Sequence, residues 1–263
     1  MEIIICSDAS GVGELAAAKL ARVVRDATSA PVLGVATGSS PLRAYLALAR
    51  LVAAGKIDLS QAYAFALDEY VGLPAGHPES YAEVIRTTVT EPLGLDPARV
   101  RCPDGFATDL EAAGPAYEAA IKAAGGVDVQ LLGVGANGHI GFNEPTSSLS
   151  SRTRIKTLAT RTRLDNQRFF AHLDEVPNHC LTQGLGTIMD ARHVVLVAQG
   201  ESKARAIRGL VEGPVTAMCP GSVLQLHPHA TIIIDEQAAR QLTLADYYRD
   251  TYAKKPSWQR FDQ

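Results

Sequence analysis

Three titratable side chains in this sequence have the types and settings that proton transfer requires. His139 and Glu144 lie five residues apart in the segment Leu131–Pro145, LLGVGANGHIGFNEP. An imidazole beside a carboxylate is a proton-transfer pair, because the acid can set the tautomer and proton affinity of the ring. Asp68, followed by Glu69, ends an apolar run, so we expect partial burial, which raises the pKa of a carboxyl group towards neutral pH. The plainer alternatives are a structural histidine and a helix-capping acid.

The glycines of the same segment match the spacing GxGxxG over Gly133–Gly138, but we reject a dinucleotide site. That fingerprint opens a helix and is followed by an acidic residue about 20 positions later. Here Gly141 and Pro145 follow at once, and the later region is basic. We interpret the glycines as positions where the backbone passes close to a small substrate.

The turn formed by Thr37, Gly38, Ser39 and Ser40 has the composition of a phosphate site. It follows an apolar strand and precedes Pro41, so we expect a helix to begin there with Ser40 as its N-cap. Free N–H groups and the helix dipole at such a position attract phosphate. A capped helix without a ligand is the alternative. The pattern GxxxxGK[ST] is absent, so a nucleoside triphosphate is not indicated.

Lys203 and Arg168 are candidates for binding the same phosphate, since Lys supplies a mobile charge and Arg a planar fork. Solvated surface charge is the alternative for both. The basic segment from Arg152 to Arg168 is also compatible with a nucleic-acid patch. Aromatic residues for stacking appear only at Phe169 and Phe170, and the net charge of the chain is −3. A small phosphorylated ligand fits better.

The elements that must position these side chains alternate along the sequence. Apolar runs predict strands at Glu2–Cys6, Val32–Ala36, Tyr63–Leu67, Val127–Val134, His193–Ala198 and Thr231–Asp235. Helical spacing and caps predict helices at Glu14–Arg25, Pro41–Ala54, Ser80–Thr88, Pro115–Ala124 and from Lys203 through Leu210. This alternation predicts an α/β fold: a doubly wound, mostly parallel sheet with helices on both faces, modified Rossmann-like.

We expect one domain over residues 1–263, because no linker, repeat or low-complexity tract interrupts the chain. The polar segment Pro145–Asn178 fits a lid better than a layer of the sheet. Four predicted strands end in polar clusters, which are TGSSP, DEY, GANGHIGFNE and QGESK. Ligands of open α/β sheets bind outside the carboxyl ends of the strands, so we expect these clusters to converge on one crevice.

Composition excludes several classes of protein. A net charge of −3 gives no general attraction to nucleic acid or to anionic membranes. The four cysteines lack a CxxC pair and histidines at metal-ligand spacing, which indicates reduced thiols and no metal site. The sequence has neither a signal-peptide pattern nor an apolar run of about 20 residues, so we expect a cytoplasmic protein.

Longer motifs resemble the glucosamine-6-phosphate deaminase family. They are the ATGSSP turn, LDEYVGLPAGHPESY (Leu67–Tyr81), GVGANGHIGFNEP (Gly133–Pro145) and SSLSSRTRIKTL (Ser147–Leu158). The match is nearly colinear as far as the ATIIIDE strand. The resemblance implies a modified doubly wound α/β domain, often assembled as a hexamer. It also implies conversion of D-glucosamine 6-phosphate and water to D-fructose 6-phosphate and ammonia, without a metal or organic cofactor.

The same resemblance assigns catalytic roles. Asp68 matches the base that moves a proton between C2 and C1, His139 the residue that opens the sugar ring, and Glu144 its acidic partner. Asn137 stands where many members carry Asp. Asn cannot ionise, but it can orient the imidazole by hydrogen bonding, and Glu144 is then the only acid in the motif. We expect activity to survive with an altered pH profile.

Two phosphate sites are implied as well. Arg168, Lys203 and the Thr37–Ser40 turn match the site for the substrate phosphate. The residues that match a second site, where N-acetylglucosamine 6-phosphate activates some members, are Met1, Ser147, Ser148, Arg154, Lys156 and Thr157. We therefore expect a sugar phosphate as ligand, this activator as a possible second one, and a homo-oligomer.

Two alternatives remain open. A 6-phosphogluconolactonase shares the architecture and a GxGxDGHxAS-type loop, but GFNEP, SSRTRIKTL and DEY favour the deaminase. A sugar-phosphate-sensing domain of a transcription regulator can use a related fold without catalysis. Against it, no helix-turn-helix pattern precedes the first strand, and Asp68, His139 and Glu144 are all present.

Overall fold

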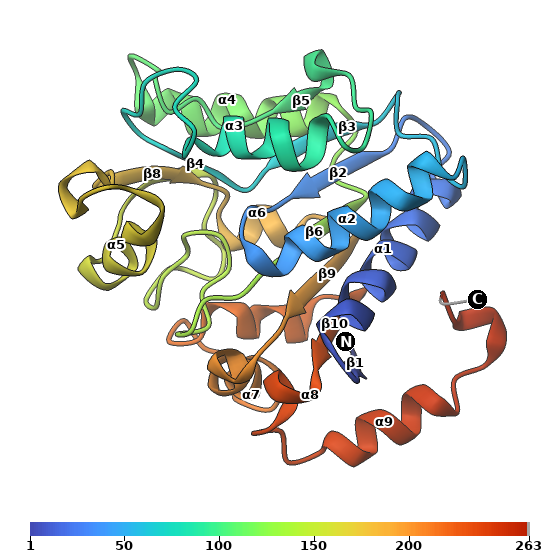
Figure 1. The fold of residues 1–263 in the computed structure, drawn as a ribbon. Coiled ribbons are helices and arrows are strands. Elements are labelled where there is room, and N and C mark those ends of the chain that lie inside the picture. Colours follow the sequence, from blue (N-terminus) through green and yellow to red (C-terminus); the bar gives the residue numbers. More distant parts are fainter. Residues whose placement is uncertain (262–263) are drawn as a thin grey trace.

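A seven-stranded sheet forms the centre of the computed structural model, which describes residues 1–261 of the chain. Its strands pair in parallel in the order β1-β10-β9-β6-β2-β3-β5 (Figure 1). They are β1 (Glu2–Cys6), β2 (Val32–Val35), β3 (Tyr63–Ala66), β5 (Val100–Arg101), β6 (Val129–Leu132), β9 (His193–Ala198) and β10 (Ala230–Asp235). The six predicted strands are all present, and the two-residue β5 was not predicted.

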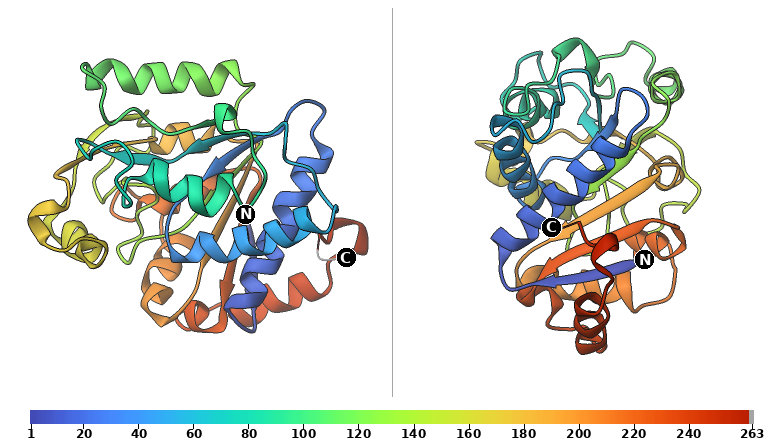
Figure 2. Two further views of the ribbon diagram at one scale, coloured as in Figure 1. Left: turned by 45° about the horizontal axis from the view of Figure 1, so that its top comes forward. Right: turned by 90° about the vertical axis from the view of Figure 1, so that its right-hand side faces the viewer.

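Helices cover both faces of this sheet, which confirms the doubly wound α/β fold. One face carries α1 (Ala9–Asp26), α2 (Ser39–Ala53) and α3 (Tyr81–Ile85); the other carries α4 (Leu110–Ala123), α6 (Leu185–Met189), α7 (Ala204–Val211) and α8 (Glu236–Ala239). Figure 2 shows α4 on the side of the sheet opposite to α1 and α2. Successive strand residues enter different cores: Val32 packs on one face, and Leu33 on the other. Burial on both sides explains why the strands are continuous apolar runs.

Three helices begin earlier than predicted. Asp8 caps α1 by accepting the Gly11 N–H at 2.8 Å, and Asp109 caps α4 before Pro115. The N-cap of α2 is Gly38 and not Ser40. Gly38 has a φ of +107°, which lets the chain turn into the helix two residues sooner than a serine cap would. Ser40 therefore lies inside the first turn and is buried.

A second, antiparallel sheet was not predicted. It joins β4 (Asp68–Tyr70), β8 (His179–Thr182) and β7 (Arg154–Thr157) in the order β4-β8-β7. The expectation that Pro145–Asn178 lies outside any sheet is therefore wrong for β7. Side chains of β7 alternate between half-buried and exposed, so the strand lacks an apolar run. The rest of this segment includes α5 (Thr160–Asn166) and short turns to one side of the molecule (Figure 1).

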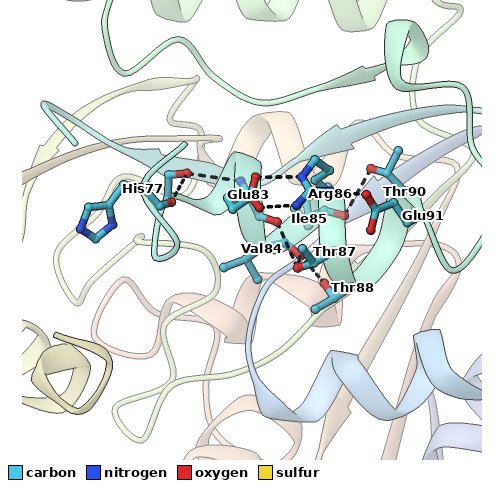
Figure 3. A network of polar contacts seen from close by, with 10 residues as sticks. His77, Glu83, Val84, Ile85, Arg86, Thr87, Thr88, Thr90 and Glu91 are labelled. Atoms are coloured by element: carbon cyan, nitrogen blue, oxygen red, sulfur yellow. Dashed lines mark hydrogen bonds and ion pairs between the residues drawn. The ribbon is translucent and has the colours of Figure 1, made fainter. Parts of the chain in front are cut away.

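The predicted helix Ser80–Thr88 forms, but it is irregular. Ser80 caps α3, which continues into a π-helical turn at Arg86–Thr90. Arg86 Nε donates to Glu83 at 2.9 Å, and its guanidinium also pairs with Glu91 across the wider turn (Figure 3). These side chains are largely solvent-exposed, so the pairs add little stability.

Candidate active site

Four loops meet at one edge of the large sheet, as the sequence predicted. They follow β9, β6, β2 and β3, which are consecutive parallel neighbours (Figure 1). Contacts join the loops: Lys203 Nζ donates to the Val134 carbonyl at 2.8 Å, and Gln199 Nε2 lies 3.5 Å from the Ser40 carbonyl. The chain leaves β2 towards β3 and leaves β6 towards β9, so the strand order reverses between them. This reversal is the switch point at which α/β sheets bind ligands.

Asp68 lies where the chain passes from β3 to β4, and its side chain is buried. Burial, together with the charge of Glu69, raises the pKa of Asp68 to about 8. A Cβ placed on Gly141 would lie 3.5 Å from Asp68 Oδ2, so the acid faces the loop that carries His139. A buried carboxyl group with a pKa near neutral can take up and return a proton.

Glu69 has a structural role. Its carboxylate accepts the backbone N–H groups of Tyr70, Tyr81 and Ala82 at 2.7, 2.9 and 2.7 Å. Burial raises the pKa of Glu69, although these three hydrogen bonds favour its ionised form. The plainer interpretation of the acidic pair, a helix cap, therefore applies to Glu69, which ties the start of α3 to β4.

His139 and Glu144 lie together in the loop after β6, with Nδ1 3.5 Å from Glu144 Oε1. Asn137 Nδ2 donates to the other carboxylate oxygen at 2.6 Å, and Thr162 Oγ1 donates to Oε1. Burial opposes ionisation of Glu144, but His139 and the hydrogen bonds from Thr162 and Asn137 outweigh it and lower the pKa of Glu144 to about 2. A proton assigned to Nδ1 faces this carboxylate and leaves Nε2 as the acceptor.

Asn137 was expected to hydrogen-bond the His139 imidazole, but it contacts Glu144 and the backbone of His139 instead. Its Oδ1 accepts the backbone N–H of His139 at 3.2 Å, while its amide nitrogen binds Glu144. It orients the acid and the backbone of the loop, and so acts on the imidazole indirectly.

The glycines of this loop make close packing possible. No helix begins at Gly138, since α5 is the next helix in the described chain, so the expectation that no regular helix follows these glycines is confirmed. A Cβ at Gly135 would lie 2.2–2.5 Å from three atoms of the His139 ring. Real Cβ atoms do not approach so closely, and the ring therefore rests on a backbone that only glycine provides.

Two of the predicted phosphate residues, Lys203 and Ser40, lie near each other, because Lys203 and Gln199 of the loop after β9 contact Val134 and Ser40. Within residues 1–261, no side chain caps α2, whose first turn contains Ser39 and Ser40. Burial, together with the charge of Arg168, lowers the pKa of Lys203. A half-buried lysine with an arginine near it forms a setting that an anion would stabilise, and an uncapped helix start attracts an anion as well.

The residues predicted for a second phosphate site lie partly together. Arg154, in β7, is half-buried and donates to Asn143 Oδ1 at 2.7 Å, next to Glu144. Ser147 is buried, and its hydroxyl has no hydrogen-bond partner within the described residues. Lys156 and Thr157 follow Arg154 in β7, and Ser148 is exposed. Met1 precedes β1 at the edge of the large sheet, apart from β7 (Figures 1 and 2).

Three contacting residues were missed by the sequence reasoning. Thr162 binds Glu144, and Asn166 Nδ2 donates to Tyr70 Oη at 2.9 Å. Thr162 and Asn166 belong to α5, and Tyr70 follows the acidic pair. The only sequence signal was the polarity of their segments, which does not identify a contact partner.

Two cavities lie elsewhere in the molecule. One, of about 480 Å³, is lined by Val24 and Gly55; the other, of about 600 Å³, lies between Lys19, His193 and Trp258 at the amino ends of the strands. Neither contains a predicted site residue. Within residues 1–261, no three His, Cys, Asp or Glu side chains are grouped as metal ligands. In that same range, no helix has the length and apolarity to cross a membrane.

Comparison with known proteins gives consistent results. Residues 7–233 match the family described as glucosamine-6-phosphate isomerases/6-phosphogluconolactonase. A glucosamine-6-phosphate deaminase of Cutibacterium acnes is 64% identical over 255 residues, covering 97% of this chain and 97% of the relative. Another, from Streptomyces coelicolor, is 58% identical over 260 residues, covering 98% and 99%.

Two solved structures resemble this chain to different degrees. A monomeric glucosamine-6-phosphate deaminase superposes with a TM-score of 0.88 at 38% identity, covering 92% of this chain and 100% of that one. A 6-phosphogluconolactonase from Trypanosoma cruzi superposes with a TM-score of 0.72 at 20% identity, covering 92% and 97%. The second likeness is one of fold alone.

Proposed function

Because the chain belongs to the glucosamine-6-phosphate isomerase/6-phosphogluconolactonase family, we propose that it is a deaminase of amino-sugar catabolism, converting D-glucosamine 6-phosphate and water to D-fructose 6-phosphate and ammonia. The observation that carries the proposal is the meeting of a buried acid, Asp68, with the His139–Glu144 pair at the switch point of the sheet. The high identity to deaminases over the whole chain favours this activity over lactone hydrolysis.

His139 opens the pyranose ring. Opening requires a proton to leave the anomeric hydroxyl and a proton to reach the ring oxygen. A neutral imidazole can do both in turn. Glu144, whose pKa is about 2, is ionised at neutral pH and stabilises the positive charge that the imidazole carries between the two steps.

Asp68 then moves a proton between two carbons. The open-chain aldehyde acidifies the C2 proton, which the Asp68 carboxylate removes. Reprotonation at C1 leaves a ketimine at C2, and water adds to that carbon and releases ammonia. Proton transfer by a positioned side chain contributes about 10²–10⁴ in rate.

The phosphate group positions the reacting end of the sugar. We assign it to the start of α2, Lys203 and Arg168; the uncapped helix start and the effect of Arg168 on Lys203 support this assignment. Binding energy from this remote group can be used to orient C1 and C2.

We also propose regulation by N-acetylglucosamine 6-phosphate in a homo-oligomer, with a hexamer as the expected form, in the cytoplasm. Support comes from Arg154, whose contact to Asn143 lies one residue from Glu144. Met1 lies apart from Arg154 in one chain, so a second subunit would have to supply it. Sedimentation velocity and substrate saturation curves with and without the activator test these proposals; a flat response restricts Arg154 to a structural role.

The decisive experiment incubates the protein with D-glucosamine 6-phosphate and measures ammonia and D-fructose 6-phosphate, with no added metal or cofactor. Turnover of this substrate is the expected result. Hydrolysis of 6-phosphogluconolactone in a parallel assay, without ammonia release, would instead support the lactonase. Tight binding of sugar phosphate without turnover of either compound would support a sensor.

A further inference from the structure

One oxygen of Glu144 faces two possible hydrogen-bond donors. Oε1 accepts the Thr162 hydroxyl and also lies 3.5 Å from His139 Nδ1. Within the described residues, His139 Nδ1 is buried and forms no hydrogen bond. A distance of 3.5 Å is beyond the usual 2.7–3.2 Å for an N–H donor. The Thr162 hydroxyl is therefore hydrogen-bonded to this oxygen, whereas the imidazole lies too far away to form a bond of its own.

Thr162 reaches this position from a segment that is anchored independently. It is 7% exposed and belongs to α5, in the segment 159–176, which we call the lid. Asn166 of the same helix donates to Tyr70 Oη at 2.9 Å, and the Phe170 ring packs edge-on against Tyr70 with centroids 6.0 Å apart. These contacts place the lid on β4, beside Asp68, without touching Glu144.

We propose that Thr162 is a positioning residue that links the lid to ring opening: while the lid is docked, its hydroxyl occupies Glu144 Oε1 and keeps the His139–Glu144 pair loose. This inference rests on the proposed function. Ring opening requires His139 to take a proton and give it up again. A tight pair would stabilise the imidazolium and retain the proton, whereas a loose pair lets the ring release it.

Other charged groups around the pair come from fixed elements. Lys203 donates to the Val134 carbonyl, Asp68 faces Gly141, Arg154 binds Asn143, and the charge of Glu144 acts on Cys180 of β8. All four lie outside the lid. Among the contacts of Glu144, the one from Thr162 is made by the lid.

The test compares T162V, which keeps the shape of the side chain and removes the hydroxyl, with the wild type. We expect the midpoint of the acid limb of kcat/KM, and the His139 Cε1–H midpoint by NMR, to rise by about 0.5–1 pH unit, since a net hydrogen bond has that magnitude. Below the midpoint, turnover falls by up to about tenfold; at high pH it approaches the wild-type rate.

Matched variants separate this role from a structural one. T162S keeps the hydroxyl and should restore the wild-type midpoint. T160V makes the same change at an exposed position of the same helix and should leave the profile unchanged. N166A removes a contact that holds the lid and leaves Glu144 untouched. As a single substitution it should raise the midpoint, whereas the double variant N166A/T162V should have the same midpoint as T162V.

The outcomes are distinct. If the wild type shows no turnover, the proposed function fails, whereas the NMR midpoints still report on the pair. If the wild type is active but T162V has an unchanged midpoint, or loses the same fraction of activity at every pH, the inference is wrong. Additive effects of N166A and T162V would also overturn it.

Discussion

At the scale of single residues, burial of Asp68 has two effects. It costs the folded protein stability, and it raises the proton affinity of the carboxyl group into the range that catalysis needs. Burial and the charge of Glu69 raise its pKa from 3.8 to about 8. Between these two pH values the unfolded chain releases the proton while the folded chain keeps it. The unfolded state then binds fewer protons, so stability falls as pH rises through this window.

Asp68→Asn should therefore separate activity from stability. We expect turnover to fall by about 10²–10⁴, because the base is lost. We also expect the variant to be more stable than the wild type at pH 8 by several kcal/mol, and equal to it near pH 4. Thermal unfolding at both pH values and an ammonia assay measure these effects. If Asp68→Asn retained turnover, a residue other than Asp68 would be the base.

Asn137→Asp places a second carboxylate at the position that now donates to Glu144 Oε2 at 2.6 Å. Two carboxylates this close cannot both ionise freely, so the pair should hold a proton well above the present pKa of Glu144, about 2. We expect the acid limb of kcat/KM to move to higher pH by about one unit or more. If N137D left the pH profile of kcat/KM unchanged, Asn137 would not control the ionisation of Glu144.

At the scale of elements, the loop after β6 depends on two glycines in different ways. Gly135→Ala would place a methyl group inside the His139 ring, whereas at Gly133 the nearest atom is Pro41 Cδ at 3.5 Å, an ordinary contact. We expect G135A to lower kcat by about 10², the effect of displacing a catalytic group by about 1 Å. G133A is the control and should keep most of the activity. Equal losses in both would contradict the assigned contact.

Six strands of the large sheet could be predicted from the sequence because they form continuous apolar runs, whereas the seventh, β5, has only two residues, Val100 and Arg101. The strand β7 could not be predicted, since RIKT has a single apolar residue, Ile155, and that side chain is exposed, so no apolar face marks the strand. Asp68, His139 and Glu144 could be named from their types and their place after strands. Thr162 could not, because its partner is 18 residues away and the contact exists only after the lid folds.

At the scale of the whole molecule, the segment 258–261 packs against α1. The helix α9 (Ala245–Ala253) runs along the outside, and the following segment returns to α1 (Figure 1). The Phe261 ring is buried with Lys19 Nζ and Lys255 Nζ at 5.2 and 5.1 Å from its centre. Arg22 donates to the carbonyls of Arg260 and Trp258 at 3.1 and 3.3 Å.

Phe261→Ala should lower the free energy of unfolding by about 3 kcal/mol, since it empties an enclosed aromatic site. We expect kcat to stay at the wild-type value, because the neighbouring residues Trp258 and Gln259 line the cavity at the amino ends of the strands, opposite the active site. Trp258→Ala is the control, as this side chain is 71% exposed. Chemical denaturation and the ammonia assay give both quantities. A loss of kcat in F261A would link the tail to the site.

The pairing of β1 with β10 also determines when this protein can fold during its synthesis. Glu2 pairs with Thr231 and Cys6 with Asp235, so the first described strand, β1, can pair only after the last described strand, β10, has been made. Contacts between such distant residues slow folding, because a long loop must close before they form. While the ribosome is still translating, Ile3 and Ile4 lack the partner strand that buries them. The nascent chain must therefore carry β1 without its partner strand until β10 has been synthesised, the stage at which chaperone binding would matter most.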